Sequence, residues 1–166
     1  MRQSFTVRRQ CQIHAPIERC FKLSTCIEVV TPILGMKPVE GRTSGLVGEG
    51  DTVLWRGWKF GLPQFHRSII EAFEPPVFFR DRMIDGRFAA FEHDHRFIAQ
   101  PDGSVLLSDE LRFSLPFGMA GAWVARFIVV PHVEKLLGRR FALIRALAEG
   151  EGWREILQPF ETDGSA

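Results

Sequence analysis

Residues 88–115, FAAFEHDHRFIAQ-PDG-SVLLSDELRFSL, contain the pattern that decides the fold. Two runs rich in β-forming residues flank a Pro-Asp-Gly turn at 101–103, which is typical of a three-residue hairpin loop that ends in a left-handed glycine. A loop of that length sets the register of both strands outward from the turn, so His95 is expected to lie opposite Asp109. The other predicted cross-strand pairs are Gln100–Ser104, Phe97–Leu107, His93–Leu111 and Phe91–Phe113.

Both strands of this hairpin place apolar residues on the same face of the sheet. Side chains alternate along a strand, so the buried face combines one set from each strand. These sets are Phe91, His93, His95 and Phe97 on the first strand, and Val105, Leu107, Asp109, Leu111, Phe113 and Leu115 on the second. A buried carboxylate without a partner is costly, so His95 and Asp109 are interpreted as a built pair.

Four roles are open to this polar pair. It can be a core hydrogen bond that tethers the sheet, or it can line a cavity and orient the polar end of a ligand. His95 can also exchange protons near neutral pH, with Asp109 as its partner. Finally, His93, His95 and Asp109 form a two-histidine, one-carboxylate set of the kind that binds metals. The neighbouring strands offer no further histidine at a matching position, so we assign no metal site and expect no cofactor.

The chain before this hairpin predicts a series of short strands. The strand-like runs lie at 4–13, 37–40, 52–60, 64–73 and 77–84. Asp85-Gly86 is a strong hairpin signal, and short strands joined by tight turns indicate an antiparallel meander. Arg80, Asp81 and Arg82 are expected on the outer face, with one of them reaching inward toward Asp109.

Helical spacing appears at three places in the chain. Two short helices are predicted at 17–24 and 27–31, the second ending before Pro32. Apolar residues then recur with a helical period over 120–148, with an interruption or kink at Pro131. The predicted fold is therefore α+β, with a curved antiparallel sheet of six to seven strands wrapped around this long C-terminal helix.

The length and the net charge of the chain limit the number of domains and the classes of partner that are expected. A chain of 166 residues is the size of one domain, so we expect a single domain over 1–166 with an ordered core at about 4–158 and a flexible tail at 161–166. The net charge is +1, without a basic tail or patch, which argues against a nucleic-acid partner. No run approaches the roughly 18 apolar residues of a membrane span, so stable membrane insertion is not expected.

Cysteine and aromatic usage add two expectations. Cys11, Cys20 and Cys26 form no CxxC pair, which favours a reducing, cytoplasmic setting. The chain has 15 Phe and 4 Trp but no Tyr, so its aromatic groups suit an apolar core or cavity.

The order of elements resembles the Bet v 1-like, START-type (SRPBCC) superfamily, and in particular its polyketide cyclase/dehydrase-like bacterial members. The residues that carry the resemblance are Ile13-His-Ala-Pro16, Cys20, Phe21, Pro32-x-x-Gly35, Phe91-x-His93-x-His95-x-Phe97, Gly103, Asp109 and Leu115-Pro116-Phe117-Gly118. The resemblance implies a helix-grip fold with two short helices after the first strand. It also implies a pocket between the sheet and the C-terminal helix for lipids, polyketides or similar apolar compounds.

The function expected first is the binding or carriage of a small hydrophobic molecule. The predicted cavity residues are Leu54, Trp58, Ile69, Phe91, Phe97, Leu107, Leu111 and Phe113 from the sheet and Phe127, Leu137 and Phe141 from the helix, with His93, His95 and Asp109 as polar contacts. One alternative is a cyclase, dehydratase or hydrolase-like enzyme that uses His95 oriented by Asp109. Another is a protein-interaction module, and a homodimer is a further state that the resemblance implies.

Overall fold

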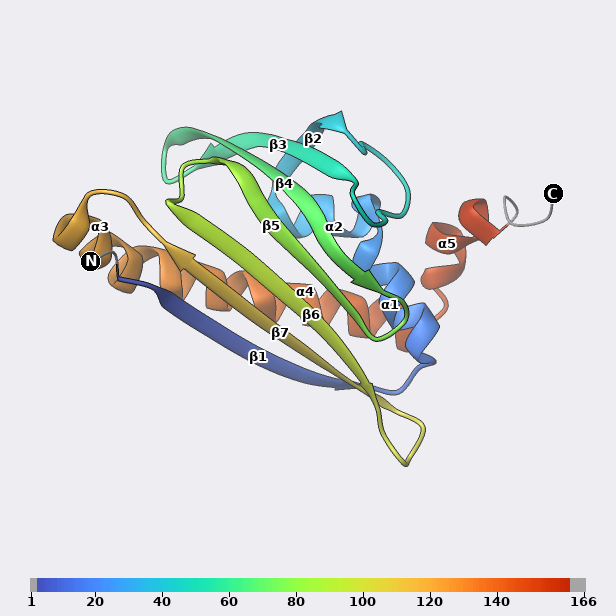
Figure 1. Ribbon diagram of the computed structural model, residues 1–166. Coiled ribbons are helices and arrows are strands. Elements are labelled where there is room, and N and C mark those ends of the chain that lie inside the picture. The colour runs from blue at the N-terminus through green and yellow to red at the C-terminus, as the bar shows by residue number, and fades with distance from the viewer. Residues whose placement is uncertain (1–2, 162–166) are drawn as a thin grey trace.

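The computed structural model describes residues 3–161 (Figure 1). The strands are β1 (Phe5–Ile13), β2 (Met36–Gly41), β3 (Thr52–Lys59), β4 (Leu62–Glu74), β5 (Phe78–Gly86), β6 (Ala90–Ala99) and β7 (Val105–Ser114). The helices are α1 (Ile17–Thr25), α2 (Ile27–Leu34), α3 (Gly118–Val124), the π-helical turn η1 (Ala125–Val129), α4 (Val130–Glu149) and α5 (Trp153–Glu161). Beyond Glu161, the flexible tail expected at 161–166 lies outside the described residues.

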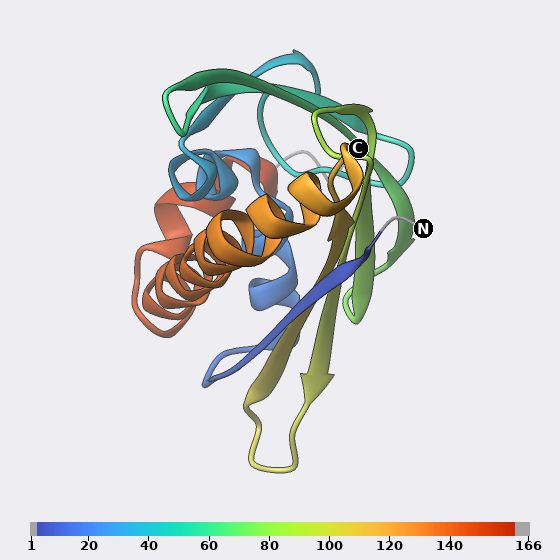
Figure 2. The same ribbon diagram turned by 90° about the vertical axis from the view of Figure 1, so that its left-hand side faces the viewer.

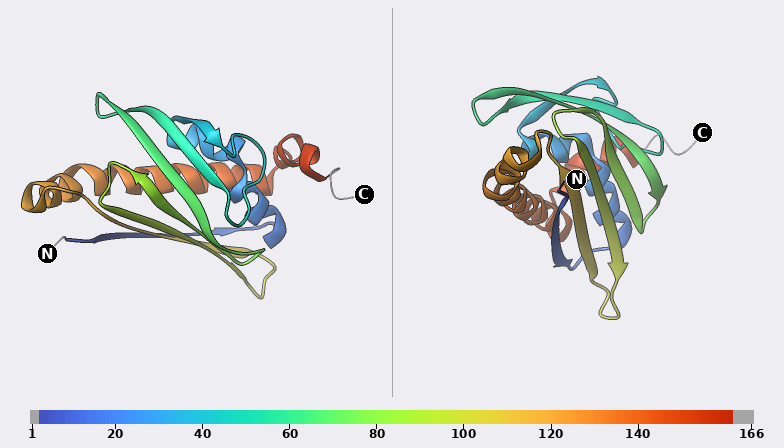
Figure 3. Two further views of the ribbon diagram at one scale, coloured as in Figure 1. Left: turned by 45° about the horizontal axis from the view of Figure 1, so that its top comes forward. Right: turned by 60° about the vertical axis from the view of Figure 1, so that its left-hand side comes forward.

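The strands form one antiparallel sheet in the order β1-β7-β6-β5-β4-β3-β2. Strands β2 to β7 follow one another as a meander, and β1 closes the edge beside β7. Figures 2 and 3 show the sheet curving around α4, with α1 and α2 on the same concave side. This architecture confirms the predicted α+β helix-grip fold. Within residues 3–161, no helix combines the length and the apolar character needed to cross a membrane.

The register of the β6–β7 hairpin is the predicted one. His95 lies opposite Asp109, and the backbone N–H of Gln100 donates to the carbonyl of Ser104 at 2.8 Å. Gly103 takes the left-handed conformation, with a φ of 81°, which the three-residue loop requires. The turn therefore determines which side chains of both strands face the helix.

Two predicted element ends are wrong. Helix α2 continues through Pro32 to Leu34, because burial of Ile33 against the core outweighs the one backbone hydrogen bond that Pro32 cannot donate. Strand β5 continues through Asp85-Gly86, where Gly86 pairs with His66 of the long strand β4. The turn falls at 87–89 instead, since pairing with β4 overrides the local turn signal.

The C-terminal helix also differs from the prediction. The residues Ala125–Val129 form a π-helical turn directly before α4, so the α-helical pattern is interrupted just ahead of Pro131, which sits in the first turn of α4. Such a turn contains one residue more than an α-helical turn and rotates the preceding side chains by roughly 100°. After Gly150 and Gly152 the chain forms α5, a helix that the sequence analysis did not predict.

One carboxylate is buried on the convex face, on the side away from the helices. Asp94 of β6 is only 1% exposed. Three guanidinium groups surround it, with Nε of Arg80 at 2.5 Å and Nη2 of Arg96 and Arg112 each at 3.2 Å. Burial alone would raise the pKa of Asp94, but the hydrogen bond from Arg80 and the charges of Arg112 and Arg80 lower it to about 2.

We expect Asp94→Asn to lower the free energy of unfolding at pH 7 by about 2 kcal/mol, the equivalent of the lowered pKa. The carboxylate of Asp94 binds a proton less readily in the folded than in the unfolded chain. Its contribution is therefore complete above about pH 4 and disappears as the pH falls toward 2. Urea denaturation of both proteins between pH 7 and pH 2 measures this difference. The exposed Asp85→Asn is the control, and a D94N deficit that persists unchanged at pH 2 would contradict the explanation.

Candidate ligand-binding cavity

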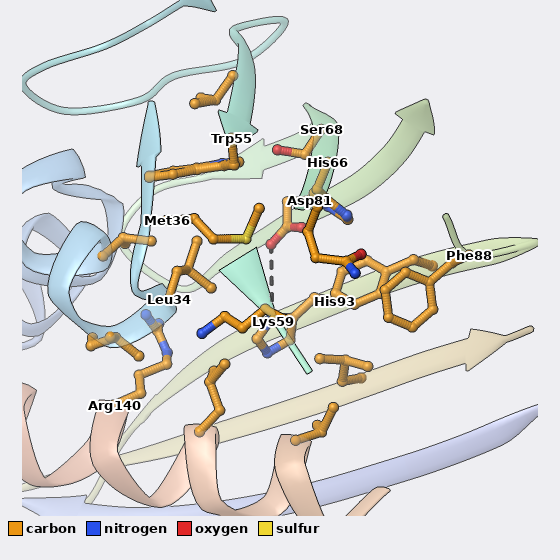
Figure 4. Close-up of a pocket in the computed structure, with 18 of the residues that line it drawn as sticks. Leu34, Met36, Trp55, Lys59, His66, Ser68, Asp81, Phe88, His93 and Arg140 are labelled. Carbon is orange, nitrogen blue, oxygen red and sulfur yellow. Dashed lines mark ion pairs between the residues drawn. The ribbon is translucent and has the colours of Figure 1, made fainter. Parts of the chain in front are cut away.

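A cavity of about 330 Å³ lies between the concave face of the sheet and helices α2 and α4 (Figure 4). This volume is within the range typical of small-molecule sites, toward its lower end. The lining is largely apolar. Its main apolar residues are Ile33, Leu34, Met36, Val53, Trp55, Ile70, Phe79, Phe88, Phe91, Leu111, Val129, Val133 and Leu136.

The cavity meets solvent between the β3–β4 hairpin and the β5–β6 loop. Phe60, Phe65 and Arg87 line the cavity and are also exposed at the surface. The ring of Phe60 contacts His132 of α4, with 5.0 Å between ring centroids, so the hairpin tip touches the helix there. A ligand entering by this route would pass two aromatic rings and one guanidinium group.

One wall of the cavity carries a cluster of five polar side chains. Asp81 comes from β5, His93 and His95 from β6, Asp109 from β7 and Arg140 from α4. His95 lies between the two carboxylates, with Nδ1 at 3.0 Å from Asp109 Oδ1 and Nε2 at 3.2 Å from Asp81 Oδ2. Arg140 Nε donates to Asp109 Oδ2 at 2.9 Å, and its Nη2 lies 3.1 Å from His95 Nδ1. The cluster therefore connects three strands to the helix that covers them.

Both carboxyl groups of the cluster are held in the ionised form. Burial acts to raise the pKa of Asp109, but the charge of Arg140, together with the charge of His95, holds it well below its usual range. Burial likewise acts to raise the pKa of Asp81. The hydrogen bond from His95 and the charges of His93 and His95 outweigh it, so the pKa of Asp81 is also lowered.

His93 is the member of the cluster that lacks a good partner. It is 7% exposed, and its Nε2 makes no hydrogen bond within the described residues. Nε2 lies 3.4 Å from Asp109 Oδ2 without the alignment of a hydrogen bond, and Nδ1 lies 3.8 Å from Asp81 Oδ2, the contact dashed in Figure 4. Burial, and then the neighbouring charge of His95, lower the pKa of His93. A buried imidazole in this state is a neutral, unsatisfied group beside the cavity.

Four further basic side chains line the cavity outside this cluster, namely Lys59, His66, Arg87 and His132. Burial lowers the pKa of His66, whose ring packs edge-on against Phe91. Burial also lowers the pKa of His132 and of Lys59, and nearby cationic side chains add to both shifts. The cavity thus has the carboxylate of Asp81 at one wall and basic side chains elsewhere in its lining.

The structure brings together only part of the predicted ligand site. Phe91, His93, His95 and Leu111 line the cavity. Asp109 lies behind the two histidines and contacts both of them, without lining the cavity itself. The remaining buried residues of the predicted site pack in the core outside the lining; they are Phe97, Leu107, Phe113, Leu137 and Phe141.

Three residues of β3 and β4 that were predicted to line the cavity lie at strand positions that alternate with the lining positions. Leu54, Trp58 and Ile69 do not line the cavity, and Trp58 is 70% exposed. The lining residues of these strands are Val53, Trp55, Ser68 and Ile70. Apolar side chains occupy consecutive positions in both strands, so alternation in the sequence does not say which of them point inward.

Phe127 of η1 is 57% exposed. The face that α4 turns to the cavity contains none of the predicted helix residues. That face consists of Val129, His132, Val133, Leu136 and Arg140.

Sequence reasoning missed the two groups that complete the cluster. Asp81 was expected among the charged residues of the outer face, although one of that group was expected to reach inward. Its place follows from the pairing of Asp81 with His93, which the misplaced turn hid. Arg140 had a usable signal, because it lies three residues after Leu137 and four before Ile144 on an otherwise apolar helix face.

We expect Arg140→Met to lower the free energy of unfolding by about 3 kcal/mol, because it leaves the carboxylate of Asp109 buried without its cation. The double variant R140M/D109N removes the charge as well and is expected to recover part of this loss. Urea denaturation of the single and double variants measures the coupling. The neighbouring exposed Arg139→Met is the control, and an R140M protein as stable as R139M would contradict a buried ion pair.

No protein-family model matches the chain, and no curated protein matches it in sequence. Solved structures match it in fold. The Zhui aromatase/cyclase from Streptomyces sp. R1128 is 14% identical with a TM-score of 0.69, over 89% of this chain and 95% of that chain. A START superfamily protein from Mycobacterium smegmatis is 11% identical with a TM-score of 0.63, over 87% and 97%.

A third similar structure is norcoclaurine synthase from Thalictrum flavum in complex with dopamine and hydroxybenzaldehyde. It is 7% identical with a TM-score of 0.65, over 89% of this chain and 88% of that chain. At these identities the likeness concerns the fold. The chain has the helix-grip fold of the Bet v 1-like, START-type (SRPBCC) superfamily, as its sequence predicts.

Proposed function

We propose that this protein binds or carries a small, largely apolar molecule in the cavity between the sheet and α4. The observation that carries the proposal is the cavity itself, about 330 Å³ in volume and lined mainly by aliphatic and aromatic side chains. A volume of this size beside a few convergent polar groups is the usual form of a small-molecule site.

The wall formed by Asp81, His93 and Arg140 gives the ligand a preferred orientation. These three side chains line the cavity, and His93 has a ring nitrogen without a hydrogen bond. A polar group of the ligand would lie against these three side chains, while the apolar part would lie against Trp55, Ile70 and their neighbours. We therefore infer a ligand with one polar end and an apolar body.

The fold comparisons are consistent with the binding of a small molecule. The norcoclaurine synthase structure holds dopamine and hydroxybenzaldehyde, which are small molecules with an aromatic ring and polar substituents. The enzyme alternative based on His95 and Asp109 has less support. His95 is only 3% exposed, and both of its ring nitrogens face carboxylates of the protein.

The alternative function of a protein-interaction module is supported by exposed apolar side chains outside the cavity. Trp58, Phe117, Met119 and Trp123 are each more than half exposed. An apolar surface together with a cavity is consistent both with small-molecule binding and with a protein-interaction module. The homodimer stays a prediction, which a measurement of the molecular mass in solution would test. The cytoplasmic setting and the absence of a nucleic-acid partner likewise stay predictions from composition.

The protein as purified is expected to carry an organic mass in a native mass spectrum that is lost when the same sample is denatured. Independently, Leu111→Trp is expected to weaken binding of the fluorescent probe anilinonaphthalene sulfonate by at least about tenfold, because the larger ring enters the cavity from β7. Fluorescence titration of the folded variants measures the dissociation constant.

Two variants serve as controls for that titration. Ile98→Trp adds the same ring at an exposed position of the neighbouring strand β6, and Trp58→Ser removes an exposed ring outside the cavity. Both are expected to bind the probe like the unmodified chain. Equal affinity in L111W, or a loss in W58S as large as that in L111W, would place the probe on the surface and contradict the proposal.

A further inference from the structure

We propose that Asp81, His93 and His95 bind one divalent transition-metal ion at the polar wall of the cavity. One ligand atom from each residue, a carboxylate oxygen of Asp81 and a ring nitrogen of each histidine, lies within 4.8 Å of the other two. All three residues line the cavity. The inference goes beyond the proposed function, because the ion would bind whether or not an apolar molecule is present.

The spacing of the three atoms suits such an ion. Ligands about 2.1 Å from a metal lie about 3.0 Å apart at a right angle and about 3.4 Å apart at a tetrahedral angle. Asp81 Oδ2 lies 3.2 Å from His95 Nε2 and 3.8 Å from His93 Nδ1. Two of the three separations are thus within about 0.6 Å of these values, and the ligand atoms of the two histidines lie within 4.8 Å of each other. Two imidazoles and one carboxylate form a set that binds zinc, iron(II) and related ions.

The second shell of this site is already in place. Metal-bound histidines usually donate their other ring N–H to a carboxylate, which sets the tautomer and the ring orientation. Asp109 occupies that position for both histidines, with Oδ1 at 3.0 Å from His95 Nδ1 and Oδ2 at 3.4 Å from His93 Nε2. Arg140 holds this carboxylate from the far side. Asp109 thus lies behind the rings and orients them, rather than serving as the third ligand considered in the sequence analysis.

The unsatisfied ring nitrogen of His93 is Nε2, which faces Asp109, whereas the proposed ligand atom is Nδ1. The side chain of His93 is nine-tenths buried, and Nε2 has no hydrogen bond within the described residues. Its Nδ1 faces Asp81 from too far for a hydrogen bond. An ion between Asp81 and His93 would supply the missing bond at Nδ1. A small rotation of the ring would then bring Nε2–H within hydrogen-bonding distance of Asp109.

The charges of the cluster leave room for a cation. The carboxylates of Asp81 and Asp109 outnumber the one guanidinium group of Arg140, so these three ionised groups carry one net negative charge. A divalent ion would change this to one net positive charge. Three protein ligands leave coordination positions open toward the cavity, and these would favour an anionic oxygen, such as a carboxylate or enolate, on the bound molecule.

The test is a titration of chelator-stripped protein with Zn²⁺ by isothermal calorimetry, without any organic ligand. We expect one ion per chain, with affinity lowered at least about 100-fold in Asp81→Asn and in His93→Gln. Asp109→Asn removes the second-shell carboxylate and keeps all three proposed ligands, and it is expected to weaken binding by about 10- to 100-fold. His132→Gln changes another histidine that lines the cavity and is expected to bind Zn²⁺ like the unmodified chain.

A Co²⁺ titration of the unmodified chain gives a readout that does not depend on the variants folding. Visible absorption bands without a near-ultraviolet thiolate band would indicate nitrogen and oxygen ligands, as proposed. Absence of stoichiometric binding would overturn the proposal. It would also fail if a thiolate band placed the ion on a cysteine, or if folded D81N and H132Q bound Zn²⁺ equally well. None of these outcomes depends on binding of the apolar probe, so this proposal and the proposed function can fail separately.

Discussion

The ion pair between Asp109 and Arg140 links the sheet to α4 inside the protein, and the geometry of the cavity depends on it. Both side chains are almost completely buried, and they come from elements that are otherwise joined by apolar contacts. Apolar contacts change gradually as a helix slides, whereas a buried carboxylate that loses its cation is strongly destabilised. The pair therefore selects one position of α4 along β7, and with it the distance between the cavity walls.

Strands β6 and β7 each carry a buried carboxylate, and the two carboxylates lie on opposite faces of the sheet. The protein compensates the charge of each in a different way. Asp94 on the convex face is surrounded by arginines that remain partly exposed, so their charges keep contact with water. Asp109 on the concave face has one buried arginine and two histidines. None of the residues of the outer cluster lines the cavity. The inner cluster borders an open volume and leaves His93 without a hydrogen bond, which is why a ligand or an ion is proposed there.

Curvature explains why that volume exists. A seven-stranded sheet that wraps one helix leaves space at the end where the helix and the strands diverge, and side chains of ordinary size do not fill it. An apolar ligand and an ion at the polar wall are compatible occupants, since the open coordination positions face the apolar volume.

Much of the hairpin that forms the polar wall could be predicted from sequence, while the rest of the site could not. The turn at 101–103 determined the pairing of His95 with Asp109, because a short loop allows one register and alternation then assigns each face. No comparable signal existed for β3 and β4, where adjacent apolar residues made both parities plausible and Trp58 was placed inside instead of Trp55. Asp81 was hidden by a turn signal that pairing with β4 overrides.

The sequence by itself thus determined the order of the elements, the helix-grip architecture and the register of one hairpin, since these depend on local turns and on periodicity. Tertiary structure alone decided which carboxylate meets which cation, that Asp81 joins the histidines, and that Arg140 reaches Asp109 from α4. These contacts join residues that lie 14 and 31 positions apart in the chain. Their distances depend on sheet curvature and on the rotation of one helix, which no local pattern of residues encodes.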